Sequence, residues 1–235
     1  MALDQTENPG ELIPLRAAVF DLDGTLIDSE PRNRVMWRKL LESHGVPHDE
    51  ALIASFAGRR GLEVLRDLLH LFPGRTAEEL FEEAISYESM PGMPSPAPVP
   101  GAVGLVRSLA DAGVPLAVVT SGQRTYAEGL LDVLGIHDLL DIVLTAGDVA
   151  TGKPHPEGYL AAARDLGVAP AEAIGFEDAP AGVAAVKSAG MVCVGITTTQ
   201  PAMALAAADH VVADLEQVNV APGPALRVPV SGART

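Results

Sequence analysis

The chain has 235 residues, of which 48% are hydrophobic and 20% charged, so it can bury a full core as one large domain or one domain with an insertion. Its formal net charge of -15 argues against nucleic acid or an anionic membrane as a partner, because no net positive field would attract a polyanion. A single cysteine, Cys193, excludes a disulfide framework and is expected to be buried in a strand. Without a signal-peptide pattern or an apolar stretch of membrane-spanning length, the sequence predicts a soluble cytoplasmic protein, in the simplest case a monomer.

Short apolar runs alternate with helical patterns along most of the chain. Nearly continuous apolar runs are typical of parallel strands covered on both faces, and they predict strands at 17–20, 116–120, 142–145, 173–176, 192–196 and 211–213. Apolar residues at three-and-four spacing predict helices at 102–112, 125–134, 157–166, 180–189 and 202–207. This alternation predicts an α/β fold, a doubly wound, Rossmann-like parallel sheet whose active site lies beyond the carboxyl ends of the strands.

The interval after the first strand breaks the alternation, since it reads as helices only and ends in a proline-rich connector. We therefore expect a catalytic core formed by residues 15–29 and 97–220. Residues 30–96 are expected to form an all-helical cap with a proline-rich hinge, able to close over the active site. Residues 1–14 and 221–235 are expected to be flexible termini.

Two carboxylates, Asp21 and Asp23, follow the first predicted strand directly. Residues two apart on an extended backbone project to the same side, so these anions start close together. They stay ionised at neutral pH only if a cation or dense hydrogen bonding compensates them, which makes a divalent metal the natural third partner. Gly24 permits a sharp turn, and the Thr25 hydroxyl could fix the loop. Taken alone, the motif fits an ordinary solvated Asp-Gly turn equally well.

Polar residues also stand at three later strand ends. Thr120 and Ser121 offer hydroxyls and backbone N–H groups that could cradle a phosphate or cap a helix. Lys153, held extended by the proline that follows it, could neutralise a phosphoryl group, with a surface lysine as the alternative. Glu177 and Asp178 follow the fourth strand; Asp178 also fits helix capping, which does not account for Glu177.

Together and in this order, these motifs resemble the haloacid dehalogenase superfamily, in the branch with a helical cap between the first and second strands. The resemblance covers about residues 17–214, and within the branch the motifs look like those of small sugar-phosphate and glycerol-phosphate phosphatases. It implies a hydrolase of a small phosphorylated metabolite that uses Mg²⁺ and an aspartyl-phosphate intermediate.

By this resemblance Asp21 would be the nucleophile and Asp23 the general acid and base. Thr120 would bind the transferring phosphoryl group, helped by the N–H of Ser121, and Lys153 would neutralise its charge. The chemistry agrees, because a carboxylate that attacks a phosphate is an anion approaching an anion and needs positive charge to screen it.

The resemblance also implies the metal ligands. Mg²⁺ would be held by Asp21, the backbone carbonyl of Asp23 and Asp178, with Glu177 in or near its coordination shell. The carbon-halogen hydrolases of the superfamily lack the second aspartate and the metal, so Asp23 argues against dehalogenation.

The cap is expected to select the substrate, a sugar or polyol phosphate. Arg59 and Arg60 are the candidates for binding a polar or anionic group remote from the phosphate, although long arginines at a helix start can equally face solvent. A β-phosphoglucomutase-type isomerase shares every core motif and is the main alternative. Thr25 and Asn33 favour the phosphatase, because the mutases usually have an apolar β-branched residue and a cap histidine near these positions. A non-catalytic binding protein would be expected to have lost Asp21 or Lys153, and this chain keeps both.

Overall fold

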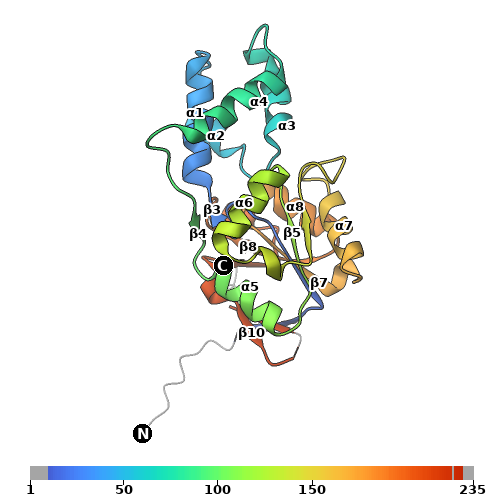
Figure 1. The fold of residues 1–235 in the computed structure, drawn as a ribbon. Helices are drawn as coiled ribbons and strands as arrows, with labels where there is room; N and C mark the ends of the chain where they lie inside the picture. The colour runs from blue at the N-terminus through green and yellow to red at the C-terminus, as the bar shows by residue number, and fades with distance from the viewer. Residues whose placement is uncertain (1–9, 224, 230–235) are drawn as a thin grey trace.

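The centre of the molecule is a six-stranded parallel sheet, seen in a computed structural model that describes residues 10–223 and 225–229 (Figure 1). Its strand order is β6-β5-β2-β7-β8-β9, and every neighbouring pair is parallel. The strands are β2 (Ala17–Phe20), β5 (Leu116–Val119), β6 (Ile142–Leu144), β7 (Ala173–Glu177), β8 (Val192–Ile196) and β9 (His210–Val212). The expected doubly wound α/β fold is confirmed, with strand ends within about one residue of the prediction.

Helices cover both faces of this sheet. Alternate side chains of β2 explain how, since Ala18 and Phe20 pack into one hydrophobic cluster while Ala17 and Val19 pack into the other. The first cluster includes residues of α5 (Ala102–Asp111) and α6 (Arg124–Leu134), and the second includes residues of α7 (Glu157–Asp165) and α8 (Pro180–Ser188). Short 3-10 turns complete the core at η3 (His137–Leu139), η4 (Pro170–Glu172), η5 (Ala202–Leu205) and η6 (Leu215–Gln217). The helix expected at 202–207 is therefore only the turn η5.

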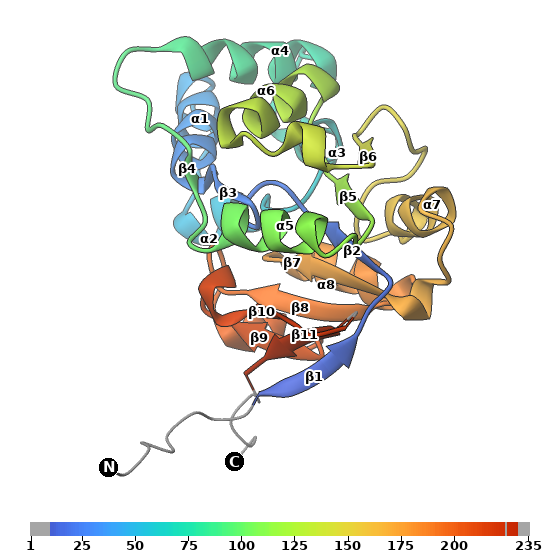
Figure 2. The ribbon, with the colours of Figure 1, turned by 60° about the horizontal axis from the view of Figure 1, so that its bottom comes forward.

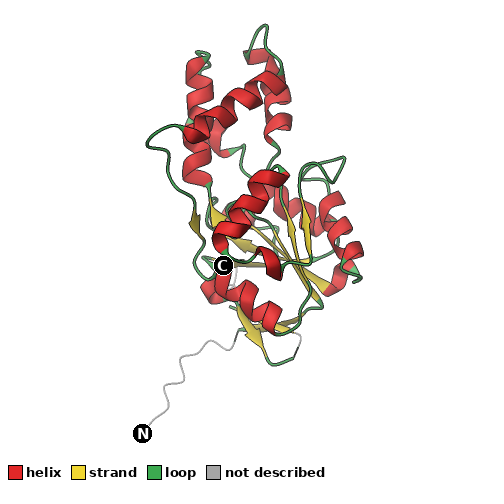
Figure 3. Ribbon diagram, viewed as in Figure 1, coloured by secondary structure: helices red, strands yellow, loops and turns green. Residues whose placement is uncertain are grey.

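The segment between β3 and β4 is helical throughout and stands above the carboxyl ends of the strands (Figures 1 and 3). It contains α1 (Glu30–Ser43), α2 (Glu50–Ala54), α3 (Gly61–Leu68), η1 (Leu69–Leu71), α4 (Ala77–Ser86) and η2 (Tyr87–Ser89). These elements enclose a hydrophobic cluster of their own, separate from the two clusters of the sheet, in which Leu40, Ile53 and Leu80 are almost completely buried. We call this segment the cap.

A polar network around Glu83 ties the ends of the cap helices together. Its carboxylate accepts hydrogen bonds from Tyr87 at 2.6 Å and from Arg75 at 3.0 Å, and His44 Nε2 lies 3.0 Å away. Burial acts to raise the pKa of Glu83, but these partners together lower it to about 2. The carboxylate is thus held ionised where α1 ends beside α4.

Two connectors join the cap to the core, and they pair with each other. In the antiparallel ribbon of β3 (Ile27–Asp28) and β4 (Ala97–Pro98), Ile27 lies opposite Pro98. The N–H of Val99 extends the pairing by donating to the carbonyl of Leu26 at 3.1 Å. Both crossings therefore lie at one place, which gives the cap a single narrow attachment to the core.

The predicted termini contain a second sheet, so the expectation of flexibility was wrong for part of them. β1 (Glu11–Pro14), β10 (Asn219–Ala221) and β11 (Ala225–Val228) form an antiparallel sheet in the order β1-β11-β10 (Figure 2). Leu226 and Val228 alternate with exposed residues and pack into a core cluster, a period-two pattern that the neighbouring glycines and prolines obscured. Residues 1–9, 224 and 230–235 of these predicted termini lie outside the described residues. No helix in the described ranges is long and apolar enough to cross a membrane.

Candidate active site

The sheet order brings the predicted site residues together. β5, β2 and β7 are neighbours, so Thr120, Asp21 and the Glu177–Asp178 pair follow one another along the same edge of the sheet. Lys153, from the loop between β6 and α7, reaches the same point and is buried with them. Residues up to 157 positions apart in the chain, from Asp21 to Asp178, thus form one acidic cluster around a lysine.

Lys153 holds two of these carboxylates. Its ammonium donates to Oδ1 of Asp21 and lies 2.6 Å from Oε1 of Glu177, while the hydroxyl of Tyr159 donates to that same oxygen at 2.6 Å. Burial acts to lower the pKa of Lys153, but the charges of Asp21 and Glu177 outweigh it and hold the pKa above its ordinary value. The lysine therefore stays protonated and can offer positive charge to an incoming anion.

Asp21 and Asp178 are short of positive charge. Burial raises the pKa of Asp21 to about 8, because Lys153 offsets that burial only in part and the negative charge of Glu177 adds to it. Burial and the neighbouring carboxylates raise the pKa of Asp178 well above its usual range as well. One lysine does not compensate this many buried carboxylates, so an additional cation is needed for both aspartates to be ionised at neutral pH.

The free oxygens of this cluster fit a divalent metal. Oδ2 of Asp21 and Oδ1 of Asp178 are buried without a hydrogen-bond partner, a costly arrangement unless a cation binds them. Carboxylate oxygens of Asp21, Glu177 and Asp178 lie within 4.8 Å of one another. Oxygen ligands at such spacing suit Mg²⁺. Glu177 also bonds Lys153, Tyr159 and the N–H of Asp178, which places it as the group that orients the lysine.

Two glycines make room for these carboxylates. Gly24 has a φ of +86°, and a Cβ there would lie 2.1 Å from Oδ2 of Asp178. A Cβ on Gly182 would lie 1.9 Å from the carboxylate of Glu177. Either position therefore excludes a larger residue for steric reasons, Gly24 also for its backbone conformation.

Other details of these loops differ from the sequence-based expectation. The Thr25 hydroxyl is buried but makes no hydrogen bond within the described residues, so it does not fix the loop as expected. Backbone bonds do so instead, including one of 2.7 Å from the N–H of Gly24 to the carbonyl of Ile27. Asp178 does not cap α8 either, since its carboxylate accepts from Thr199.

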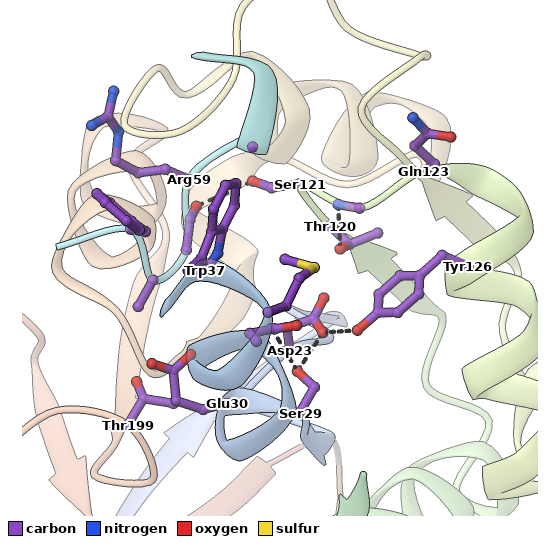
Figure 4. Close-up of a pocket in the computed structure, with 18 of the residues that line it drawn as sticks. Asp23, Ser29, Glu30, Trp37, Arg59, Thr120, Ser121, Gln123, Tyr126 and Thr199 are labelled. Carbon is purple, nitrogen blue, oxygen red and sulfur yellow. Dashed lines mark hydrogen bonds between the residues drawn. The ribbon is translucent and has the colours of Figure 1, made fainter. Parts of the chain in front are cut away.

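Asp23 lies in a different environment from Asp21. Its Oδ1 accepts a hydrogen bond of 2.5 Å from Ser29 and one of 2.6 Å from Tyr126, as the dashed lines in Figure 4 show. Burial and the charge of Asp23 raise the pKa of Tyr126, so the phenol remains a donor. Sequence reasoning missed both hydroxyls, because nothing in the pattern indicates that Tyr126, in α6, faces this loop.

Thr120 and Ser121 also line the space in front of Asp21. The Thr120 hydroxyl accepts from the N–H of Gly122 at 2.9 Å, which orients it at the end of β5. The Ser121 hydroxyl donates to the carbonyl of Gly58 in the cap at 3.1 Å. The cap therefore contacts the core directly at the predicted phosphate-binding loop.

The two candidate arginines have different surroundings. Arg60 donates to the carbonyls of Val149 at 2.9 Å and Ala150 at 3.4 Å, in the loop that leads to Lys153, and it does not line the main cavity. Arg59 does line that cavity, but it pairs with Asp67 at 2.6 Å, and its guanidinium points away from Asp23 in Figure 4. Arg59 thus contributes its stem to the cavity, whereas Arg60 links the cap to the core.

A cavity of about 400 Å³ lies between cap and core and is lined by Asp21 and Asp23. Figure 4 shows Asp23 in it, with Trp37 of the cap and Thr120 of the core among the other lining residues. Its size falls in the ordinary range for small-molecule sites, roughly 300–1,000 Å³. The core contributes acidic and hydroxyl groups, and the cap contributes a mixed wall. The cap wall includes Glu30, Asn33, Trp37, Phe56, Arg59, Phe81 and Glu88. Trp37 packs into the hydrophobic cluster of the cap and also lines the cavity.

The site combines an α/β core, a helical cap, and buried carboxylates around a lysine at the cavity between them. A family model described as haloacid dehalogenase-like hydrolase matches residues 15–190, and the chain belongs to this family. It is 50% identical to validoxylamine A 7'-phosphate phosphatase from Streptomyces hygroscopicus subsp. limoneus, over 86% of this chain and 95% of that protein.

Two further relatives agree with this assignment. The chain is 33% identical to hexitol phosphatase A from Escherichia coli (strain K12), over 88% of this chain and 94% of that protein. A crystal structure of β-phosphoglucomutase from Clostridium difficile superposes with a TM-score of 0.75 at 28% identity, covering 87% of this chain and 93% of that one. The family and the phosphatases in it identify the protein as a phosphoric monoester hydrolase.

Proposed function

We propose that the protein hydrolyses the phosphate ester of a small sugar or polyol, with Mg²⁺ as cofactor and with phosphorylated Asp21 as the intermediate. The observation that carries this proposal is the unpaired, buried oxygen of Asp21 in the lining of the cavity, near Asp178, which also has an unpaired buried oxygen. A carboxylate held by a lysine on one oxygen and unbonded on the other is suited to attack a phosphorus atom.

Asp21 and Asp23 are placed to carry out both half-reactions, Asp21 as the nucleophile and Asp23 as the acid and then the base. An oxygen of Asp21 forms a bond to phosphorus as the bond to the leaving alcohol breaks, and Asp23 donates the proton that this alcohol takes up. Asp23, then ionised, accepts a proton from the water that attacks phosphorus, and the bond between phosphorus and Asp21 breaks, which releases inorganic phosphate and restores the carboxylate. Its bonds to Ser29 and Tyr126 hold it at the cavity for both steps. Lys153 screens the negative charge throughout.

A metal ion would complete the charge balance. Asp178 would hold Mg²⁺ through its free oxygen and Asp21 through the carboxylate oxygen that does not attack phosphorus, and the carbonyl of Asp23 stays a predicted third ligand. When bound, the ion would stabilise negative charge on the phosphoryl group and lower the pKa of both aspartates.

The cavity supports a sugar-sized substrate over a smaller one. Its lining includes Asp21 and aromatic side chains of the cap, and its volume of about 400 Å³ is more than a three-carbon polyol needs. One phosphatase relative is named for a hexitol, an alcohol of this size, and another for validoxylamine A 7'-phosphate. The cytoplasmic location, the monomeric state and the lack of nucleic-acid binding stay predictions.

A mutase is the alternative, and the cavity argues against it. A phosphosugar mutase must hold a bisphosphate, so its cap needs positive charge for the second phosphate. Among the described residues that line the main cavity, Arg59 is the one guanidinium, and Asp67 neutralises it. Phosphorylated Asp21 should therefore react with water.

Phosphorus NMR tests both points in one experiment. With β-glucose 1-phosphate, Mg²⁺ and a trace of the 1,6-bisphosphate, we expect inorganic phosphate to accumulate, and we expect a chelator to stop its release. Stoichiometric glucose 6-phosphate with little free phosphate would show a mutase instead. Release that continues in excess chelator would contradict the role of the metal.

A further inference from the structure

The cap wall carries two carboxylates that the proposed reaction does not use. Glu30 opens α1, Glu88 lies in η2, and both line the cavity. Arg34 donates to Oε1 of Glu30 at 2.9 Å, and Arg32 lies 3.3 Å from Oε2 of Glu88. Neither of these arginines lines the cavity. In the described part of the chain the second oxygen of each carboxylate has no partner, so each can accept a hydrogen bond from a ligand.

Aromatic side chains stand beside these carboxylates. Glu30, Asn33 and Trp37 are three and four residues apart, which places them on one face of α1. Trp37 packs edge-on against Phe56 with ring centroids 5.4 Å apart, and both rings line the cavity. Aromatic faces attract cations, and together with carboxylates they form an environment that favours a positively charged ligand group.

Each charged group of this wall has a partner, but the carboxylates are the charges that it presents to the cavity. Arg34 and Arg32, which pair with Glu30 and Glu88, do not line the cavity, and the guanidinium of Arg59 is turned to its own partner, Asp67. Both carboxylates are mostly buried, with side-chain exposures of 15% and 23%. Charges so little exposed to solvent act strongly on a neighbour, so a second anionic group would be repelled here and a cation attracted.

We propose that the alcohol released by this enzyme carries a protonated amine among its hydroxyls, and that Glu30 and Glu88 bind this amine. The inference rests on the proposed phosphatase function and narrows its substrate to amino sugars and amino polyols. The phosphate end lies at Asp21 and Lys153, and the amine end lies at the cap.

Steady-state kinetics with matched esters test this inference. We expect kcat/KM for glucosamine 6-phosphate to exceed that for glucose 6-phosphate and N-acetylglucosamine 6-phosphate by about tenfold, the usual effect of a charge-assisted hydrogen bond. In Glu30→Gln and Glu88→Gln this preference should fall, and in the double variant it should disappear. Glu78→Gln is the matched control, since Glu78 pairs with Arg66 at 3.0 Å outside the cavity, and it should keep the preference.

The possible outcomes distinguish a failure of the amine-binding role from a failure of the phosphatase function. Equal kcat/KM for the three esters, or a preference that survives in the double variant, would overturn the amine-binding role while the phosphatase function stands. Failure of the wild type to hydrolyse any of them, and p-nitrophenyl phosphate as well, would overturn the proposed function and this inference with it.

Discussion

Asp21→Asn is expected to lose roughly 10⁴-fold or more in phosphate release, the loss typical of removing a nucleophile. The amide is nearly the same size but cannot attack phosphorus or hold a cation by charge. Lys153 keeps its 2.6 Å contact with Glu177, and one of several buried like charges disappears. We therefore expect the melting temperature to change by no more than about 5 °C. Phosphate release and thermal unfolding followed by circular dichroism measure the two effects.

Asp28→Asn is the matched control for this variant. Asp28 lies in the same segment and accepts a bond of 3.2 Å from the N–H of Glu30, but it does not line the cavity. It should retain wild-type activity. An active Asp21→Asn enzyme would show that another group is the nucleophile, and an unfolded one would show that this buried carboxylate supports the fold.

Asp23→Asn is expected to separate the two half-reactions. Loss of a general acid and base costs roughly 10²- to 10⁴-fold, and alkyl phosphates should lose this much. p-Nitrophenolate leaves without a proton, so Asp21 should still be phosphorylated by p-nitrophenyl phosphate, while the attack of water stays slow. We expect a burst of p-nitrophenolate equal to the enzyme concentration, followed by slow turnover, in stopped-flow absorbance.

Tyr126→Phe provides the comparison for Asp23→Asn. It removes only the hydrogen bond of 2.6 Å to Asp23, so it should reduce turnover far less. If Asp23→Asn lost the same factor on alkyl and aryl phosphates without a burst, Asp23 would not be the acid and base of both steps.

The strands and the cluster of carboxylates were predictable because both depend on local pattern. Continuous apolar runs predicted the parallel strands. Because the carboxyl ends of parallel strands lie at one edge of the sheet, Asp21, Thr120 and Asp178 were expected to lie close together there. β11 was not predicted, because its short alternation lies beside glycine and proline and depends on pairing with the distant β1.

The polar partners of the site could not be predicted in the same way. Ser29 and Tyr126 reach Asp23 through the packing of α1 and α6, which sequence spacing does not specify. The same holds for Arg60, whose guanidinium contacts backbone carbonyls 89 and 90 residues away. Long side chains of the cap have several targets within reach, and the packing of the cap on the core decides which of them they contact.

Trapping of phosphorylated Asp21 is the most direct test of its role as the nucleophile. The enzyme is mixed with Mg²⁺ and p-nitrophenyl phosphate, quenched in acid within milliseconds, digested, and analysed by mass spectrometry. We predict one phosphoryl group on the peptide that contains Asp21, sensitive to hydroxylamine as an acyl phosphate is, and more abundant in Asp23→Asn. A phosphoryl group on another residue, or turnover with no phosphorylated peptide in either enzyme, would contradict the assignment of Asp21 as the nucleophile.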